Sequence, residues 1–79
     1  MAPGGQASAQ RLLADNLRLL RLMRRLSQTV LAEEAGVTQS LVSAIERGRA
    51  NPTLDSLERI ALVLGVRIGE LFEQSEGRK

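Results

Sequence analysis

The sequence predicts an all-α fold, a single small domain built from five short helices. Apolar residues recur at helical spacing through most of the chain, and helix start and stop residues cut this pattern into short segments. No stretch has the apolar alternation of a strand. The 79 residues, of which 43% are hydrophobic and 25% charged, fit a folded domain with a simple core better than a disordered chain.

The first helix is expected over residues 10–26. Leu13, Leu17 and Leu20 repeat there at the spacing that places side chains on one face of a helix. The rest of the segment is strongly basic. Its arginines are Arg11, Arg18, Arg21, Arg24 and Arg25.

The stretch "LAEEAGVTQSLVSAIERG" contains a glycine that divides it into two helices. Ser27 is a good N-cap for a helix over residues 28–35, and Gly36 falls where a left-handed residue would end that helix. Thr38 is again an N-cap residue, which starts a third helix over residues 39–47. Inside one continuous helix the glycine would cost about 1 kcal/mol. The stretch is therefore predicted to be two helices and a turn.

The fourth helix has equally clear boundaries. Pro52 forbids continuation of the third helix, Thr53 is an N-cap residue, and Gly65 is placed to end the fourth. A short fifth helix is expected over residues 68–74. The inner face of the fourth helix is predicted to hold Leu54, Leu57, Ile60, Ala61 and Leu64.

The two ends of the chain differ from this pattern. Residues 1–9 are small and lack periodicity, so they are expected to form a flexible N-terminal arm before a domain over residues 10–74. Residues 75–79 are expected to be a disordered tail. The chain has no cysteine, no apolar run of membrane-spanning length and no secretory signal, so a cytoplasmic location is expected.

The second and third helices with their turn match a helix-turn-helix, in which two helices cross steeply around a short turn containing glycine. Ala32 is small where the two helices must cross, and Val37 fits the angle between them. Val42 and Ile45 give the third helix a buried face. The opposite face of that helix is then exposed.

The segment over residues 13–72 resembles the Cro/repressor-type (XRE) helix-turn-helix family, which includes phage repressors and restriction-modification controller proteins. The motifs "SQ", "LA", "AGV", "IERG", "NPTL" and "LGV" occur in order at the spacing of that family. The resemblance implies a compact lambda-repressor-like domain. It also implies that the helix over residues 39–47 enters the major groove of double-stranded DNA.

The exposed face of that helix supplies the candidate DNA contacts. A glutamine can pair with adenine, serine with several bases, and alanine with a thymine methyl group. The predicted base contacts are Gln39, Ser40, Ser43 and Ala44. The predicted phosphate contacts are Gln28, Thr38, Arg47, Arg49 and Asn51. A basic bias supports this assignment, because residues 1–49 hold seven arginines against four acidic residues.

The resemblance also implies a structural ion pair between Arg21 and the glutamate of "IERG", Glu46. Related small repressors pair into dimers through their C-terminal end, where this chain has Val66, Ile68, Leu71 and Phe72. Some of these side chains must belong to the core, and the remainder are the candidate dimer surface. Such a homodimer would set two recognition helices about 34 Å apart on a near-palindromic operator.

Two features of the first helix depart from the family pattern. Leu19, Leu22 and Met23 occupy positions that are more often polar, and Arg25 replaces the usual glycine before "LSQ". The three apolar residues are either buried within the domain or form a contact patch for the arm, another subunit or a protein partner.

The expected function is that of a dimeric transcriptional regulator, a repressor or a controller-type autoregulator. The chain has no His, Cys or Tyr and no phosphate-binding glycine loop, so no catalytic, cofactor or metal site is expected. A single aromatic residue argues against single-stranded nucleic acid as the ligand. The alternatives are an antitoxin or other protein-interaction module on the same fold, or the DNA-binding half of a larger sensor regulator.

Overall fold

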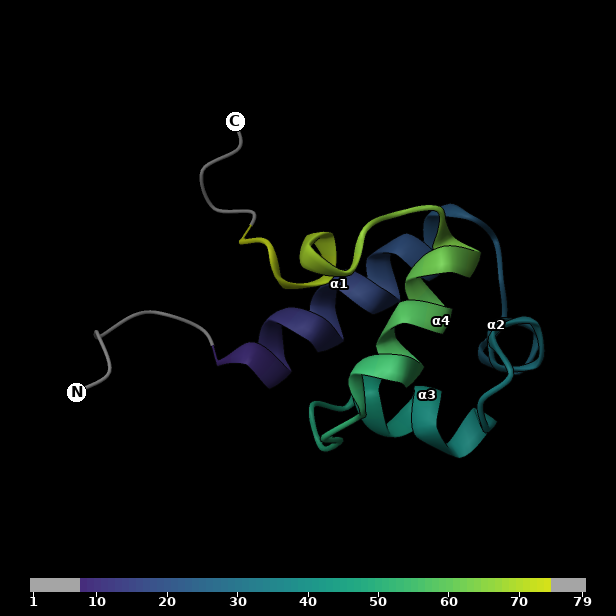
Figure 1. Cartoon of the computed structure of the whole chain (residues 1–79), viewed down its shortest axis with the longest axis horizontal. Coiled ribbons are helices and arrows are strands. Elements are labelled where there is room, and N and C mark those ends of the chain that lie inside the picture. Colours follow the sequence, from purple (N-terminus) through teal and green to yellow (C-terminus); the bar gives the residue numbers. More distant parts are fainter. Residues whose placement is uncertain (1–7, 75–79) are drawn as a thin grey trace.

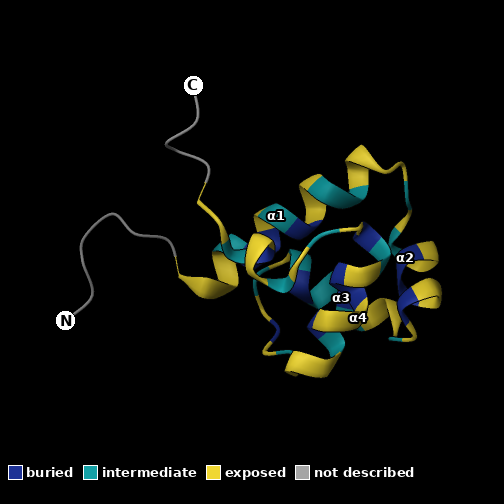
Figure 2. Ribbon diagram, turned by 45° about the horizontal axis from the view of Figure 1, so that its top comes forward, coloured by how far each residue is buried: buried dark blue, intermediate teal, exposed yellow. Residues whose placement is uncertain are grey.

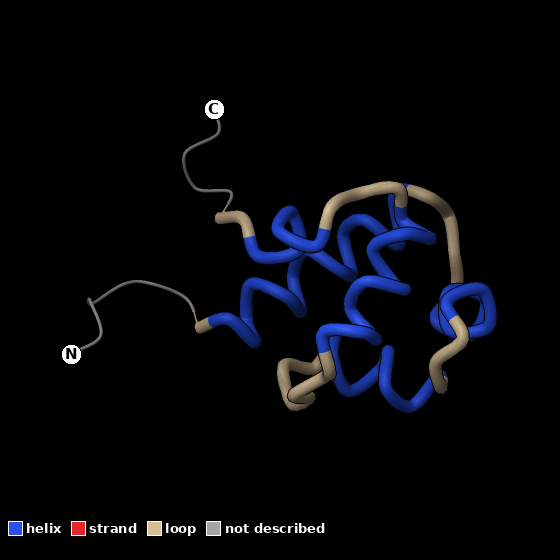
Figure 3. Tube along the Cα trace, viewed as in Figure 1, coloured by secondary structure: helices blue, strands red, loops and turns tan. Residues whose placement is uncertain are grey.

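The computed structural model describes residues 8–74, and this part of the chain contains helices but no strand (Figures 1 and 3). The predicted all-α fold is therefore confirmed. The elements are α1 (Ala9–Met23), α2 (Gln28–Ala35), α3 (Gln39–Glu46), α4 (Leu54–Leu64) and the 3₁₀ helix η1 (Ile68–Phe72).

The expected fifth α-helix is instead the 3₁₀ helix η1, which ends at Phe72 rather than at residue 74. Five residues make little more than one turn, and Gly69 within them has low helix propensity, so the tighter 3₁₀ form is favoured. The Glu70 carboxylate stabilises the start of η1 by accepting a hydrogen bond of 3.0 Å from the backbone N–H of Arg67.

The bounds of the first helix also differ from the prediction. Ser8 caps α1 by accepting a hydrogen bond of 3.1 Å from the backbone N–H of Arg11, so Ser8 and Ala9 belong to the helix rather than to the arm. At the other end α1 stops at Met23, because Arg25 has a left-handed φ of 58°. This conformation explains why glycine is the usual residue there. The rest of the predicted arm, and the predicted tail, lie outside the described residues.

The helix-turn-helix has the predicted start and stop residues. The hydroxyl groups of Ser27 and Thr38 each accept a hydrogen bond of 3.0 Å from the backbone N–H three residues further on. Between these caps Gly36 has a φ of 74°, and the backbone N–H of Val37 donates to the Ala32 carbonyl at 3.0 Å. The glycine is therefore required by the turn.

We expect Gly36→Ala to destabilise the protein by about 1 kcal/mol, because a left-handed conformation is unfavourable for any residue with a Cβ atom. The new Cβ would also lie 3.1 Å from the Arg59 Nη1 atom. Urea unfolding measures the change. Gly69→Ala is the matched control, because a Cβ there meets nothing within 4 Å and the backbone is not left-handed. Equal stability of the two variants would contradict this view of the turn.

One core joins all five elements, and the buried residues lie on the sides of the helices that face one another (Figure 2). Leu54 is a correction to the predicted core: it is 72% exposed, because it is the first residue of α4 and the buried face of that helix begins at Leu57. Within residues 8–74 no helix is long and apolar enough to cross a membrane. The largest fully buried side chains are those of Leu17, Leu31, Val42, Ile45, Ile60, Leu64 and Leu71.

Candidate nucleic-acid interface

The outer side of α3, next to the turn, is exposed to solvent. Val42 and Ile45 are buried beneath it, so the helix geometry directs the intervening side chains away from the core. Gln39 and Ser40 are exposed, whereas Ser43 and Ala44 are half-buried. Ala44 also packs against the core cluster, which leaves only part of its methyl group available to a base.

A chain of four side chains connects α1 to the start of α3. Arg21 binds Glu46 through two hydrogen bonds, Nε to Oε2 at 2.6 Å and Nη2 to Oε1 at 3.0 Å. The Gln28 Nε2 atom donates to the same Glu46 Oε1 at 3.0 Å, and the Gln28 Oε1 atom accepts from Gln39 Nε2 at 2.7 Å. We call these four residues the polar network. It holds the first residue of α3 in a fixed relation to α1 and α2.

The expected pairing of Arg21 with Glu46 is thus present, and it is shielded from water. The two side chains are 12% and 5% exposed, and a third guanidinium bond runs from Arg21 Nη1 to the Leu26 carbonyl at 2.8 Å. By contrast, the ion pair between Asp55 and Arg59 on α4 joins side chains that are 72% and 54% exposed. Only the buried pair is expected to matter for stability.

Gln28, which is predicted to contact a phosphate, forms a bridge within the domain. Its amide bridges Glu46 and Gln39, and its Nε2 atom retains one further N–H for another acceptor. Sequence reasoning missed this bridge. The signal for it is that Gln28 and Gln39 each follow an N-cap residue, so both stand at the first position of their helices.

The carboxylate of Glu46 stays ionised to lower pH than usual. Burial by itself would raise its pKa, but the hydrogen bonds from Arg21 and Gln28, with the charges of Arg21 and Arg18, outweigh burial and lower the pKa. The same ion pair raises the pKa of Arg21. The pair is therefore charged over the whole neutral range.

This lowered pKa predicts a dependence of stability on pH. Since the pKa of Glu46 is lower in the folded than in the unfolded state, the ion pair contributes fully above about pH 4.3, the ordinary value for glutamate. Its contribution is lost as the pH falls through the folded-state pKa. The difference in melting temperature between the wild type and Glu46→Gln should therefore be largest near neutral pH and shrink in acid. A constant difference from about pH 7 to about pH 2.5 would contradict this linkage.

The remaining predicted DNA contacts lie around α3. Arg47 Nη1 donates to the Ser43 hydroxyl at 2.5 Å, so these two side chains are joined across one turn of the helix. Thr38, Arg49 and Asn51 are exposed. The Thr38 hydroxyl is already the N-cap of α3, so the backbone at this helix start is better placed than the hydroxyl to meet a phosphate.

The predicted C-terminal dimer surface is largely inside the domain. Leu71 is a correction, because it is fully buried in the core and cannot contact another subunit. Val66, Ile68 and Phe72 are half-buried and pack against the same core. By contrast, Leu19 and Leu22 on α1 are each 52% exposed and Met23 is 63% exposed.

The sequence and the fold both match known helix-turn-helix proteins. The family model described as "Helix-turn-helix" covers residues 17–71. The Neisseria hypothetical transcription factor of Neisseria meningitidis serogroup B is 42% identical over 60 residues, which are 76% of this chain and 57% of that protein. The immunity repressor protein of Bacillus phage phi105 is 37% identical over 57 residues, which are 72% of this chain and 40% of the repressor. The chain thus spans about half the length of these two relatives.

Two solved structures resemble this chain in both fold and sequence. The crystal structure of a hypothetical transcription factor, NHTF, from Neisseria has a TM-score of 0.84 at 33% identity, and the match covers 99% of this chain and 93% of that chain. The restriction-modification controller protein C.AhdI from Aeromonas hydrophila has a TM-score of 0.76 at 35% identity, covering 80% of this chain and 96% of the controller.

The same fold also occurs as part of an enzyme. A hydroxypropylphosphonic acid epoxidase from S. wedmorenis has a TM-score of 0.76 at 35% identity, but the match covers 86% of this chain and only 36% of the epoxidase. The resemblance is thus to one portion of that enzyme. With the family model matching from α1 to η1, this chain belongs to the helix-turn-helix family of DNA-binding regulators.

Proposed function

We propose that the protein is a sequence-specific regulator of transcription that binds double-stranded DNA and reads the major groove with α3. The observation that carries this proposal is the polar network. It positions Gln39 at the exposed start of α3 through a 2.7 Å hydrogen bond to Gln28, which is itself held by the shielded Glu46. A reading side chain held in one orientation gives up less conformational freedom on binding.

The chemistry of Gln39 suits adenine. Its Nε2 atom gives one N–H to Gln28, which leaves the other N–H and the side-chain oxygen for adenine N7 and N6. Ser40 is exposed beside it and adds a hydroxyl that accepts or donates. Ala44, with part of its surface open, contacts a thymine methyl group. Readout weighted toward A·T pairs follows from these three side chains.

Phosphate groups on either side of the reading helix are bound by a second set of residues. These are Gln28, the start of α3 at Thr38, Arg47, Arg49 and Asn51. Arg47 turns away from Ser43 toward a phosphate on binding, which frees the Ser43 hydroxyl for a base edge. The regulator acts in the cytoplasm as a homodimer on a near-palindromic operator. It represses or controls transcription and has no catalytic activity of its own.

A protein-interaction function on the same fold is the second candidate, and the exposed Leu19, Leu22 and Met23 favour it. In that case the chain would serve as an antitoxin or as the DNA-binding half of a larger sensor regulator. Relatives of both lengths share this fold, because the phi105 repressor extends well beyond the matched segment whereas the match covers 96% of the controller C.AhdI.

Salt dependence tests the DNA-binding proposal. Removal of one phosphate contact should lower the magnitude of the slope of log affinity against log salt by about 0.9 on duplex DNA. Each substitution removes one contact from both subunits of the proposed homodimer, so we expect Arg47→Ala and Arg49→Ala each to flatten this slope by roughly two units in fluorescence anisotropy titrations. Arg67→Ala, which removes an exposed arginine next to η1, is the control and should leave the slope unchanged. Identical slopes for all three variants would reject the assigned phosphate surface.

A further inference from the structure

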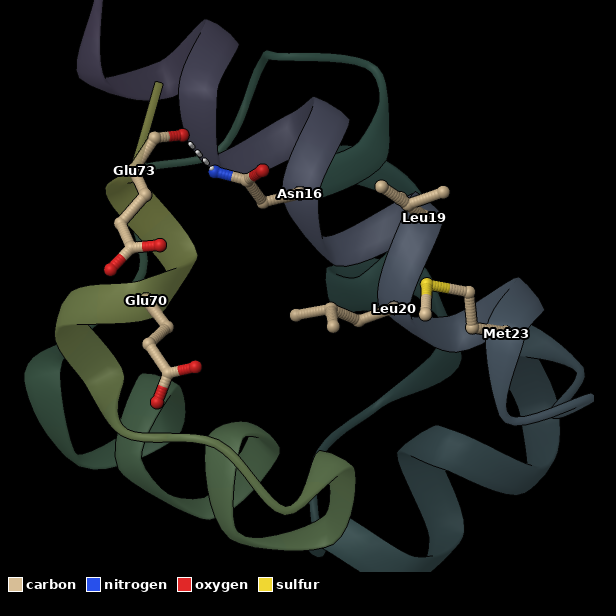
Figure 4. A pocket seen from close by; sticks show the side chains of 6 residues that line it. All are labelled: Asn16, Leu19, Leu20, Met23, Glu70 and Glu73. Atoms are coloured by element: carbon tan, nitrogen blue, oxygen red, sulfur yellow. Dashed lines mark hydrogen bonds between the residues drawn. The ribbon is translucent and has the colours of Figure 1, made fainter. Parts of the chain in front are cut away.

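A groove of about 360 Å³ runs between α1 and η1 on the surface of the domain (Figure 4). Its α1 wall is apolar and its η1 wall is acidic. The two walls are joined by the Asn16 amide, whose Nδ2 atom donates to the carbonyls of Leu71 at 2.9 Å and Glu73 at 2.8 Å. The lining residues are Asn16, Leu19, Leu20, Met23, Glu70 and Glu73.

The apolar wall continues out of the groove along α1. Leu22 lies beside Leu19 on the helix and is also 52% exposed, so three large apolar side chains form one strip with Met23. We call these three residues the apolar strip. Exposed leucines scattered singly need no explanation, but a contiguous apolar patch marks an interaction surface.

Opposite charges flank the apolar strip. Asn16 and Leu20 on α1 line the groove beside η1, and at about 100° per residue Arg18 lies on the other side of the apolar strip, away from η1. Glu70 and Glu73 occupy the other flank, on η1 and directly after it. Among the residues that the structure describes, neither Arg18 nor Glu73 takes part in an ion pair. Each flank therefore presents a charge with no ion-pair partner within this part of the chain.

We infer that the groove and the apolar strip bind the same face of a second copy of this chain. The inference rests on the homodimer of the proposed function and names its contact surface. A two-fold axis parallel to α1 brings the basic flank of one copy against the acidic flank of the other, so Arg18 faces the partner's Glu73. An axis perpendicular to α1 would instead bring like charges together. Self-complementarity of this kind is what a two-fold interface requires.

This surface fits a partner copy better than the C-terminal cluster does. Leu71 is fully buried, and Phe72 packs against the core and lines a smaller hollow of about 180 Å³ together with Leu13, Pro52 and Leu57. The strip on α1, by contrast, has three neighbouring side chains that are at least half exposed. Burying them supplies the apolar centre of an interface, and the two charged flanks supply its polar rim.

Sedimentation equilibrium on the full chain tests the surface. Replacing two apolar side chains at the centre, as in Leu19→Lys combined with Met23→Lys, should raise the dissociation constant of the dimer at least about tenfold. Leu62→Lys is the matched control, because Leu62 on α4 is 81% exposed and lies outside the groove, and it should leave the constant unchanged. Circular dichroism checks that the variants fold, as expected for substitutions of exposed residues.

Exchanging the flanking charges adds a test of the axis. Arg18→Glu or Glu73→Arg alone should weaken the dimer severalfold, and the two together should restore it. A wild type that stays monomeric at every concentration, a dimer unaffected by the α1 variants, or no rescue by the double exchange would overturn the inference. None of these results would by itself refute the proposed DNA binding, because monomers should retain salt-dependent affinity for duplex DNA. Absence of that affinity in an intact dimer would instead refute the proposed function.

Discussion

Glu46→Ala should lower the free energy of unfolding by about 3–5 kcal/mol, the usual cost of removing one partner from a buried ion pair. The variant leaves the guanidinium of Arg21, only 12% exposed, without its carboxylate, and it removes the acceptor of the Gln28 amide. Thermal unfolding measures the effect. At several degrees per kcal/mol in a domain of this size, the melting temperature should fall by more than about 10 °C.

Asp55→Ala is the matched control for this experiment. It also removes a carboxylate from an ion pair with an arginine, at a distance of 2.9 Å, but both side chains are more than half exposed. Its expected cost is below about 1 kcal/mol. A melting temperature of Glu46→Ala within about a degree of the wild type would show that the pair does not hold α1 to α3.

Gln39→Ala should reduce affinity for the specific operator by about 5- to 150-fold for each half-site bound, the equivalent of one bidentate base contact worth roughly 1–3 kcal/mol per subunit. Affinity for scrambled DNA should not change, because that binding depends on the phosphate contacts. Gln39 is exposed, so its removal should have little effect on stability. Parallel anisotropy titrations on the two DNA probes measure the change.

Gln28→Ala separates orientation from contact. It removes the hydrogen bond that orients Gln39, and it removes one proposed phosphate contact. The Gln39 side chain itself is still present to contact a base. Specific affinity should fall by less than with Gln39→Ala, and affinity for scrambled DNA should fall slightly as well. If Gln39→Ala weakened both probes equally, Gln39 would be a general contact and not a reader of bases.

The parts of the fold that can be predicted from sequence are those that local chemistry decides. Ser27, Thr38 and Thr53 are identifiable as N-caps because a side-chain oxygen at that position satisfies a backbone N–H of the first turn, and each does so. Gly36 is predictable for the same reason, since only a left-handed residue fits its turn. The partnership of Arg21 with Glu46 comes from family resemblance, because residues 25 positions apart carry no local signal for contact.

The features that sequence does not predict depend on where elements end and how they meet. Helical periodicity places Leu54 on the inner face of α4, but it cannot show that the first turn of that helix extends beyond the core. The burial of Leu71 and the 3₁₀ form of η1 depend on how the last segment packs on α1. The bridge through Gln28 arises only once three helices are assembled.

The most direct test of the central proposal compares the affinity of the full chain for DNA from immediately upstream of its own gene with its affinity for scrambled DNA. Fluorescence anisotropy from about 50 to 200 mM salt gives both values. Specific sites are typically bound about 10³-fold or more tightly than non-specific DNA. We predict a ratio of that order that falls sharply in Gln39→Ala. Equal, weak binding of both probes would contradict autoregulation, and failure to bind DNA at all would contradict the role assigned to α3.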